Sequence, residues 1–222
     1  EVAVRLGGAA DDEGNPAEGD GGTVDVANDG AITTRGTLSH GLVVQSIGGG
    51  GGLLIADTDA VSVTPSTDNS GSGGAVTVTT GSALAYGDRA YALLIQSLGG
   101  GGGAVNDRYV GSSFGQGTAS DVTVAVSGDL GTFGSNGVGL LAQSEARGDA
   151  GAIAISVAGN LVAGGYRGLG VKGDSSSLEG SSGAIAIDIL GGVEAAGEES
   201  LGVDSFLESA QPVDQSVVLS IG

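Results

Sequence analysis

The sequence contains no cysteine, methionine or tryptophan and only three prolines. Without cysteine, the chain forms neither disulfides nor thiolate metal sites. Aromatic residues make up 3% of the chain, so its core must be filled by small aliphatic side chains, which suits strands in repeated register. No apolar run approaches the ~20 residues of a membrane-spanning helix, and helical spacing is absent. These absences favour an all-β protein.

Basic residues are also scarce: seven Lys and Arg stand against 26 Asp and Glu, giving a net charge of −19. Such a surface repels phosphate backbones, so we expect no nucleic-acid partner. The acidity fits a solvated surface, self-repulsion between long molecules or weak calcium binding. The stretch ADDEGNPAEGD at 10–20 is the candidate for calcium, although its spacing is not that of an EF-hand. We expect no metal site and no cofactor, and leave calcium open for this loop.

Glycine, in contrast, supplies 47 of the 222 residues, about three times the usual ~7% share. Glycine pairs six residues apart recur five times, each preceded by a short alternating apolar strand. The first glycines of successive pairs lie 51, 47, 31 and 32 residues apart. These pairs are Gly30/Gly36, Gly81/Gly87, Gly128/Gly134, Gly159/Gly165 and Gly191/Gly197. We expect each glycine to allow a positive φ or a sharp bend at a corner between strands.

Repeats that stack on one another bury a continuous column of apolar side chains. We therefore predict an all-β fold, a right-handed parallel β-helix with three strands per coil and about five full coils in a single unit over 1–222. Extra length would leave at one shared corner, as excursions over 7–22, 48–74 and 99–121. Residues 2–6 would be the third strand of an incomplete first coil. Because both ends of the chain read as strands, we interpret it as an internal segment of a longer protein.

The third strand of each coil has two outward columns with chemical interest. Val43, Leu94 and Leu141 form an apolar stripe, which is either a contact patch for a partner or a surface covered by the excursions. Gln45, Gln96 and Gln143 form the next column, and amides on stacked coils ~4.8 Å apart can bond in a ladder. His40, the single histidine, is expected in the inward column that Tyr91 shares.

Two patterns resemble enzyme sites, and a third resembles an ice-binding surface. GDSSS at 173–177 is similar to a serine-protease motif, but its Asp174 and Ser175 occupy the Gln-Ser position of the repeat. Carboxylate pairs would be needed for polysaccharide cleavage, and the aspartates fall in different columns (Asp121, Asp129, Asp149, Asp188 and Asp204). A threonine column for ice binding begins at Thr77 and Thr123 and ends at Ala154. We therefore expect no catalytic residues.

The phrases HGLVVQSIGGGGG (40–52) and YALLIQSLGGGGG (91–103) resemble a repeat of the passenger regions of very large, glycine-rich autotransporter proteins of Gram-negative bacteria. The resemblance is strong over the first two coils, partial at Gln143-Ser144, and limited to strand spacing beyond. It implies a secreted, surface-displayed β-helix upstream of an outer-membrane β-barrel, which is absent from this chain and would be its only membrane contact.

Such passengers act in cell adhesion, aggregation or biofilm formation. We therefore expect a non-enzymatic structural and adhesive segment at the bacterial cell surface. Its partners would be a host surface, a neighbouring cell or another copy of the chain. The alternative is a glycan-cleaving β-helix enzyme of the polysaccharide lyase or hydrolase type, which two carboxylates on neighbouring coils facing a cleft would favour.

Overall fold

The computed structural model describes residues 2–6, 18–56, 61–65, 68–107, 109–211 and 216–222. The first sheet is parallel, in the order β2-β7-β12-β15-β18-β21. Most of its side chains alternate, with apolar residues on the inner face and small or polar residues on the outer face. They are β2 (Val24–Asn28), β7 (Val76–Thr80), β12 (Val122–Val126), β15 (Ile153–Val157), β18 (Ile185–Ile189) and β21 (Val217–Ile221).

The second and third sheets are also parallel and each contains one strand per coil. The second sheet holds β3 (Ile32–Thr34), β8 (Ala83–Ala85), β13 (Leu130–Thr132), β16 (Leu161–Ala163) and β19 (Val193–Ala195). The third sheet holds β4 (Leu42–Ile47), β9 (Tyr91–Leu98), β14 (Val138–Ala146), β17 (Leu169–Ser177) and β20 (Leu201–Glu208).

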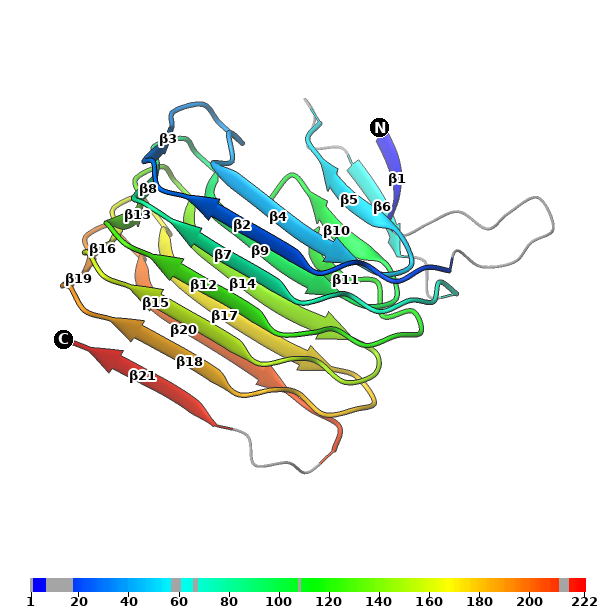
Figure 1. Ribbon diagram of the computed structural model, residues 1–222. Coiled ribbons are helices and arrows are strands. Elements are labelled where there is room, and N and C mark those ends of the chain that lie inside the picture. The colour runs from blue at the N-terminus through cyan, green and yellow to red at the C-terminus, as the bar shows by residue number, and fades with distance from the viewer. Residues whose placement is uncertain (1, 7–17, 57–60, 66–67, 108, 212–215) are drawn as a thin grey trace.

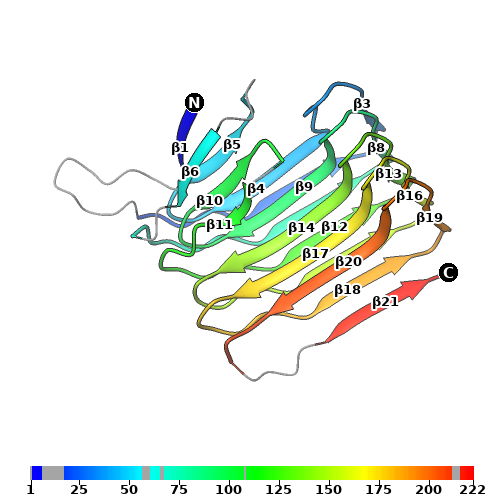
Figure 2. The same cartoon turned by 180° about the vertical axis from the view of Figure 1, so that it is seen from behind.

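The three sheets wind into a solenoid. In Figure 1 the chain runs leftward along the first sheet, turns to the back at the left edge, and returns rightward along the third sheet while descending. Figure 2 shows the third sheet from its own side. This path is a right-handed parallel β-helix, as the sequence predicts.

The interior is a stack of aliphatic columns. Val78, Val124, Ile155 and Ile187 are in register on neighbouring strands, and each is 3% exposed or less. Because each side chain rests on the equivalent side chain of the next coil, small branched residues fill the core without large rings.

The glutamine and the serine of each Gln-Ser pair lie on opposite faces of the third sheet. The serines are buried and join the end of the third strand to the backbone that enters the first sheet. Ser144 Oγ donates to the carbonyl of Ser120 (2.9 Å) and accepts from the amide of Gly151 (2.7 Å). Ser46 and Ser175 bond in the same way, which explains why a serine recurs at this position.

At the corners, aspartate side chains of one coil form hydrogen bonds with the backbone of the next coil. A carboxylate oxygen of one coil accepts a backbone N–H of the next at 2.7–2.8 Å, in the pairs Asp20/Ser72, Asp88/Ser135, Asp121/Ala152, Asp129/Asn160 and Asp149/Ser181. The bonds to Ser181 hold the pKa of Asp149 below its usual value. Part of the acidity of the chain therefore satisfies backbone donors at exposed corners.

The corner glycines lie at sharp bends, as predicted, but none of the five pairs uses the alternative of a positive φ. Gly36, Gly87, Gly134, Gly165 and Gly197 do not have positive φ. A Cβ on Gly87 would instead collide with the carbonyl oxygen of Gly36, and Gly134, Gly165 and Gly197 meet the preceding glycine likewise. The left-handed φ of 52–58° falls on other residues of this corner, Leu38, Arg89, Asn136, Arg167 and Glu199. The glycines permit close stacking of coils.

The excursions form a small sheet of their own. β5 (Gly51–Leu54) pairs in parallel with β10 (Gly102–Val105), and β10 pairs antiparallel with β11 (Tyr109–Ser112). These strands stand at the end of the solenoid where β4 and β9 finish (Figure 1). The 48–74 and 99–121 excursions therefore leave at one corner and stack on each other, whereas most of the 7–22 excursion lies outside the described residues.

The expected third strand of an incomplete first coil is wrong. β1 (Val2–Leu6) pairs in parallel with β6 (Val61–Pro65) inside the second excursion, and among the described residues β4 has β9 as its neighbour in the third sheet. Parallel pairing needs only an alternating strand and a matching register. A strand of the excursion can therefore be the partner of β1 in place of β4.

Candidate functional site

The outward apolar stripe of the third sheet is covered. Leu94 is fully buried and Leu141 is 6% exposed. Together with Tyr91 they pack against Ala104 of β10, with Val43 and Val110 at the margin. The hypothesis of an exposed contact patch at Val43, Leu94 and Leu141 is therefore wrong. The hairpin of β10 and β11 folds back over the stripe because burying these side chains is favourable.

Beside this second core runs a ladder of amides. Gln45 Nε2 donates to Gln96 Oε1 at 2.6 Å, and Gln96 Nε2 donates to Gln143 Oε1 at 2.6 Å. Gln96 is fully buried and Gln143 is 3% exposed. Three consecutive coils thus place identical side chains at one register position, and each amide satisfies the next.

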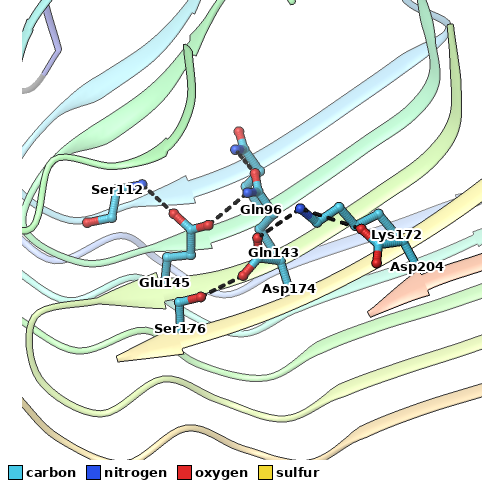
Figure 3. Close-up of polar contacts among 8 residues, drawn as sticks. All are labelled: Gln96, Ser112, Gln143, Glu145, Lys172, Asp174, Ser176 and Asp204. Carbon is cyan, nitrogen blue, oxygen red and sulfur yellow. Dashed lines mark hydrogen bonds and ion pairs between the residues drawn. The ribbon is translucent and has the colours of Figure 1, made fainter. Parts of the chain in front are cut away.

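The ladder ends on a carboxyl group that the sequence analysis did not single out. Gln143 Nε2 donates to Glu145 Oε1 at 2.8 Å, and the backbone N–H of Ser112 in β11 donates to Glu145 Oε2 at 2.8 Å (Figure 3). The amide donors of the ladder all point the same way, so the last amide needs an acceptor. Glu145 supplies it and ties the covering hairpin to the third sheet.

Glu145 is 7% exposed, and the pKa of its carboxyl is raised from the ordinary 4.5 to about 8, mainly because of burial. The charge of Asp174 nearby contributes to this rise, while the hydrogen bonds from Ser112 and Gln143 and the charge of Lys172 oppose it. Near neutral pH the group is therefore mostly protonated. A carboxylic acid in this state is a proton donor.

The fourth coil replaces the glutamine with Asp174, which is 7% exposed. Its Oδ1 accepts from Ser176 Oγ at 2.6 Å, and its Oδ2 lies 3.6 Å from Lys172 Nζ. The same ammonium lies 3.9 Å from Asp204 Oδ2 (Figure 3). Lys172 and Asp204 are in register with Leu141 and therefore continue the apolar stripe as a charged column.

A hollow of about 260 Å³ opens beside these groups. Its polar wall contains Asp107, Gln143, Glu145, Lys172 and Asp174, and its apolar wall contains Tyr91, Val110, Val138, Leu141 and Leu169. The two carboxyl groups of Glu145 and Asp174 come from adjacent strands of the third sheet. Two carboxyl groups on neighbouring coils therefore face one hollow, which is the arrangement expected to favour the alternative of a glycan-cleaving enzyme.

His40 and Tyr91 lie next to the hollow rather than in the interior column expected for them. Tyr91 packs with Leu94 and Leu141 in the outer cluster, because the regular pairing of β9 with β14 is interrupted between Tyr91 and Leu93. His40 Nδ1 accepts the Tyr91 backbone N–H at 3.1 Å, and the rings are 5.2 Å apart. Burial lowers the pKa of His40 and raises that of Tyr91.

The protease-like motif has a structural explanation. Ser175 Oγ donates to the carbonyl of Gly151 at 2.9 Å and accepts from the amide of Gly183 at 3.1 Å. The hydroxyl is fully buried and belongs to the serine column of the repeat. Asp174, its neighbour in the motif, points to the other face of β17, toward Lys172 and Ser176.

Residue spacing alone could locate only part of this site. Repeat alignment identifies Gln45, Gln96 and Gln143, but Glu145 falls where the first two coils have Ile47 and Leu98. That replacement of an aliphatic residue by an acid, two positions after a ladder glutamine, is the signal that the sequence contained. Asp107 carries no such signal, because it lies in the excursion; Arg89 Nε donates to its Oδ1 at 2.8 Å.

Within the described residues, no group of three or more histidine, aspartate or glutamate side chains is arranged to hold a metal ion. The calcium candidate at 10–20 lies largely outside those residues; Asp20, which is described, accepts from the amide of Ser72. The part of the chain that the structure describes also contains no helix long and apolar enough to cross a membrane.

No protein-family model matches the chain, and no match is found among the curated proteins or the solved structures.

Proposed function

We propose that this chain is a structural and adhesive segment of the passenger of a secreted autotransporter, displayed at the bacterial cell surface. In this role it acts in adhesion, aggregation or biofilm formation. Its partner is a host surface, a neighbouring cell or another copy of the chain.

One observation carries the proposal: every part of the repeated phrase that resembles autotransporter passengers has a construction role in the solenoid. The glutamine enters the amide ladder, the serine joins the third sheet to the first, and the glycine run begins the stacked excursions. A phrase used in this way is a building unit that can be repeated along a stalk.

The interior supports the same role. Aliphatic columns run from coil to coil, and backbone and side-chain hydrogen bonds join each coil to the next. A solenoid joined along its whole length resists bending, so it can hold an adhesive surface away from a membrane. Its net charge of −19 opposes unspecific association of the stalk.

Display on a heterologous cell tests this proposal. The chain is fused to an unrelated autotransporter barrel in a non-aggregating Gram-negative host, and settling and attachment to epithelial cells are measured. We expect the settling or the attachment of these cells to exceed that of cells displaying the barrel alone. A Leu94→Asp variant of the displayed chain puts a charge under the covering hairpin and disrupts it. Leu190→Asp, at a side chain 63% exposed, is its matched control. Equal settling and attachment with and without the chain would rule the adhesive role out.

A second candidate is favoured by the hollow beside Glu145 and Asp174. A protonated acid next to a second carboxyl group is the pair that glycoside hydrolysis uses, and lysine can serve as a base in related eliminations. Incubation with a polysaccharide panel, followed by assay of reducing ends, tests this activity. Glu145→Gln, which keeps the amide ladder supplied with an acceptor, should abolish it. Absence of released ends from every polysaccharide would exclude it.

A further inference from the structure

We propose that the hollow between the third sheet and the covering hairpin binds a single neutral sugar ring, such as the terminal pyranose of a cell-surface glycan. This deepens the proposed function, on which it rests for the encounter with glycans, by naming the ligand class of the adhesive segment.

The size of the hollow limits the ligand. At about 260 Å³ it is smaller than the ~300–1,000 Å³ of pockets that enclose drug-sized molecules. One ring fits this space, whereas an oligosaccharide would have to extend from it into solvent. A terminal sugar unit is therefore the expected occupant.

The polar wall matches hydroxyl groups. Lys172 offers ammonium donors, Asp174 offers carboxylate acceptors, and Glu145 offers a carboxyl group that is largely protonated near neutral pH. A sugar hydroxyl both donates and accepts, so it can bridge such alternating partners. Hydrogen bonds to charged groups contribute more than those between neutral groups.

The opposite wall matches the carbon skeleton of a sugar. Val138, Leu141 and Leu169 supply aliphatic surface, and Tyr91 adds an aromatic side chain. A pyranose has a face of C–H groups that is removed from water on such a surface. A ligand with hydroxyls around its rim and an apolar face satisfies both walls at once.

The charges of the hollow favour a ligand without charge. Asp107 is paired with Arg89, whose guanidinium lies 2.5 Å from it. Asp174 is paired with Lys172 at 3.6 Å. Because each ionised wall group already has an opposite charge beside it, a cationic or anionic ligand would have to displace a partner and gains little net attraction. Neutral sugars avoid that cost.

Saturation-transfer NMR on the full chain tests the proposal. The probes are the methyl glycosides of glucose, galactose, mannose, fucose and N-acetylglucosamine, with the methyl glycoside of glucuronic acid as the charged comparison. We expect transfer from the protein to at least one neutral glycoside. Asp174→Asn and Lys172→Met should each weaken the affinity at least about tenfold, as expected for the loss of a charged hydrogen-bond partner.

Asp188→Asn is the matched control, because Asp188 is an exposed aspartate on the outer face of the first sheet; its affinity should equal that of the unaltered protein. Circular dichroism of each variant shows whether the solenoid persists. Transfer to no neutral glycoside, binding of the glucuronide alone, or equal affinity in a folded Asp174→Asn or Lys172→Met protein would overturn the proposal.

These outcomes are separate from the test of display. Adhesive cells whose chain binds none of the glycosides would refute the sugar site and leave the proposed function standing. A chain that binds a glycoside and yet confers neither settling nor attachment would refute the adhesive role and leave the sugar site standing.

Discussion

Gln96 donates a hydrogen bond of 2.6 Å to the amide oxygen of Gln143, although 47 residues separate them in the chain. The amide oxygen of Gln96 in turn accepts a hydrogen bond from the amide of Gln45. Each of these contacts joins one coil to the next. The contact between Gln96 and Gln143 is buried, and there a hydrogen bond is stronger and an unmade one more costly. The ladder is therefore both a source of stability and a check on the register of the coils.

Loss of the central amide should be costly. Gln96→Ala removes the donor to Gln143 and the acceptor from Gln45, and leaves buried polar atoms without partners. We expect the free energy of unfolding to fall by about 2–4 kcal/mol. Chemical denaturation measures the change. Gln116→Ala, at an exposed side chain, should alter it by less than about 0.5 kcal/mol. An equal effect of the two substitutions would contradict the ladder.

The buried acid should make stability depend on pH. Because the pKa of Glu145 is raised in the folded chain from 4.5 to about 8, the folded state binds more protons than the unfolded state between these values. Its contribution is fully present below about pH 4.5 and is lost as the pH rises through about 8. Glu145→Gln should therefore be more stable than the unaltered protein at pH 9, and the difference should vanish toward pH 5.

The comparison with Glu145→Gln is necessary because many other carboxylates titrate in the same chain. Asp188→Asn, at an exposed position, shows how much of the pH dependence arises from net charge alone. Parallel stability profiles of the Glu145→Gln and unaltered proteins from pH 5 to 9 would show that Glu145 is not held protonated.

The covered stripe predicts a core substitution effect at a position that reads as surface. Leu94 is fully buried under the hairpin, so Leu94→Ala should lower the free energy of unfolding by about 2–5 kcal/mol. Leu190→Ala, at a side chain 63% exposed, should lower it by less than about 1 kcal/mol. Hydrogen exchange of β10 and β11 should accelerate in Leu94→Ala alone. Unchanged exchange in that variant would mean that the hairpin does not rest on the stripe.

Two glycines of the five-residue runs provide a matched pair. Gly52 and Gly103 have similar positive φ, 147° and 133°, and are partners in register on β5 and β10. A Cβ on Gly52 meets nothing within 4 Å, whereas one on Gly103 would collide with the carbonyl oxygen of Gly52. Both alanines are strained by about 1–3 kcal/mol through φ.

The collision adds to this strain only in Gly103→Ala. We expect Gly103→Ala to destabilise the stacked excursions by at least about 1 kcal/mol more than Gly52→Ala, as measured by hydrogen exchange of β10. Equal exchange in the two variants would show that the glycine runs serve backbone conformation alone and not the close approach of the excursions.

Repeat spacing predicted most of the architecture, because every coil must place the same side chains at the same register positions. The interior columns, the three-strand coil and the amide column of Gln45, Gln96 and Gln143 all follow from that requirement. The roles of the corner glycines did not follow. Coil-to-coil contact, not φ, fixes Gly87 and Gly134, and a single coil read in isolation does not contain that contact.

The candidate site depended on residues that the repeat does not relate. Glu145 lies in the third coil, Asp174 in the fourth and Asp107 in an excursion. Regular pairing of β14 with β17 brings Glu145 and Asp174 together, but the approach of Asp107 depends on how the hairpin folds back, which no period in the sequence encodes. The pairing of β1 with β6 has the same origin, since both strands lie outside the regular coils.

By itself the sequence determined that thirty-residue units must stack, because an alternating aliphatic strand buries its inner face only against the equivalent strand of its neighbours. Only the tertiary structure decided where the excursions, which are the residues beyond the regular coils, lie. The excursions return over the third sheet because Leu94 and Leu141 would otherwise face water, and in doing so they turn an outer apolar stripe into a second core with a polar hollow at its edge.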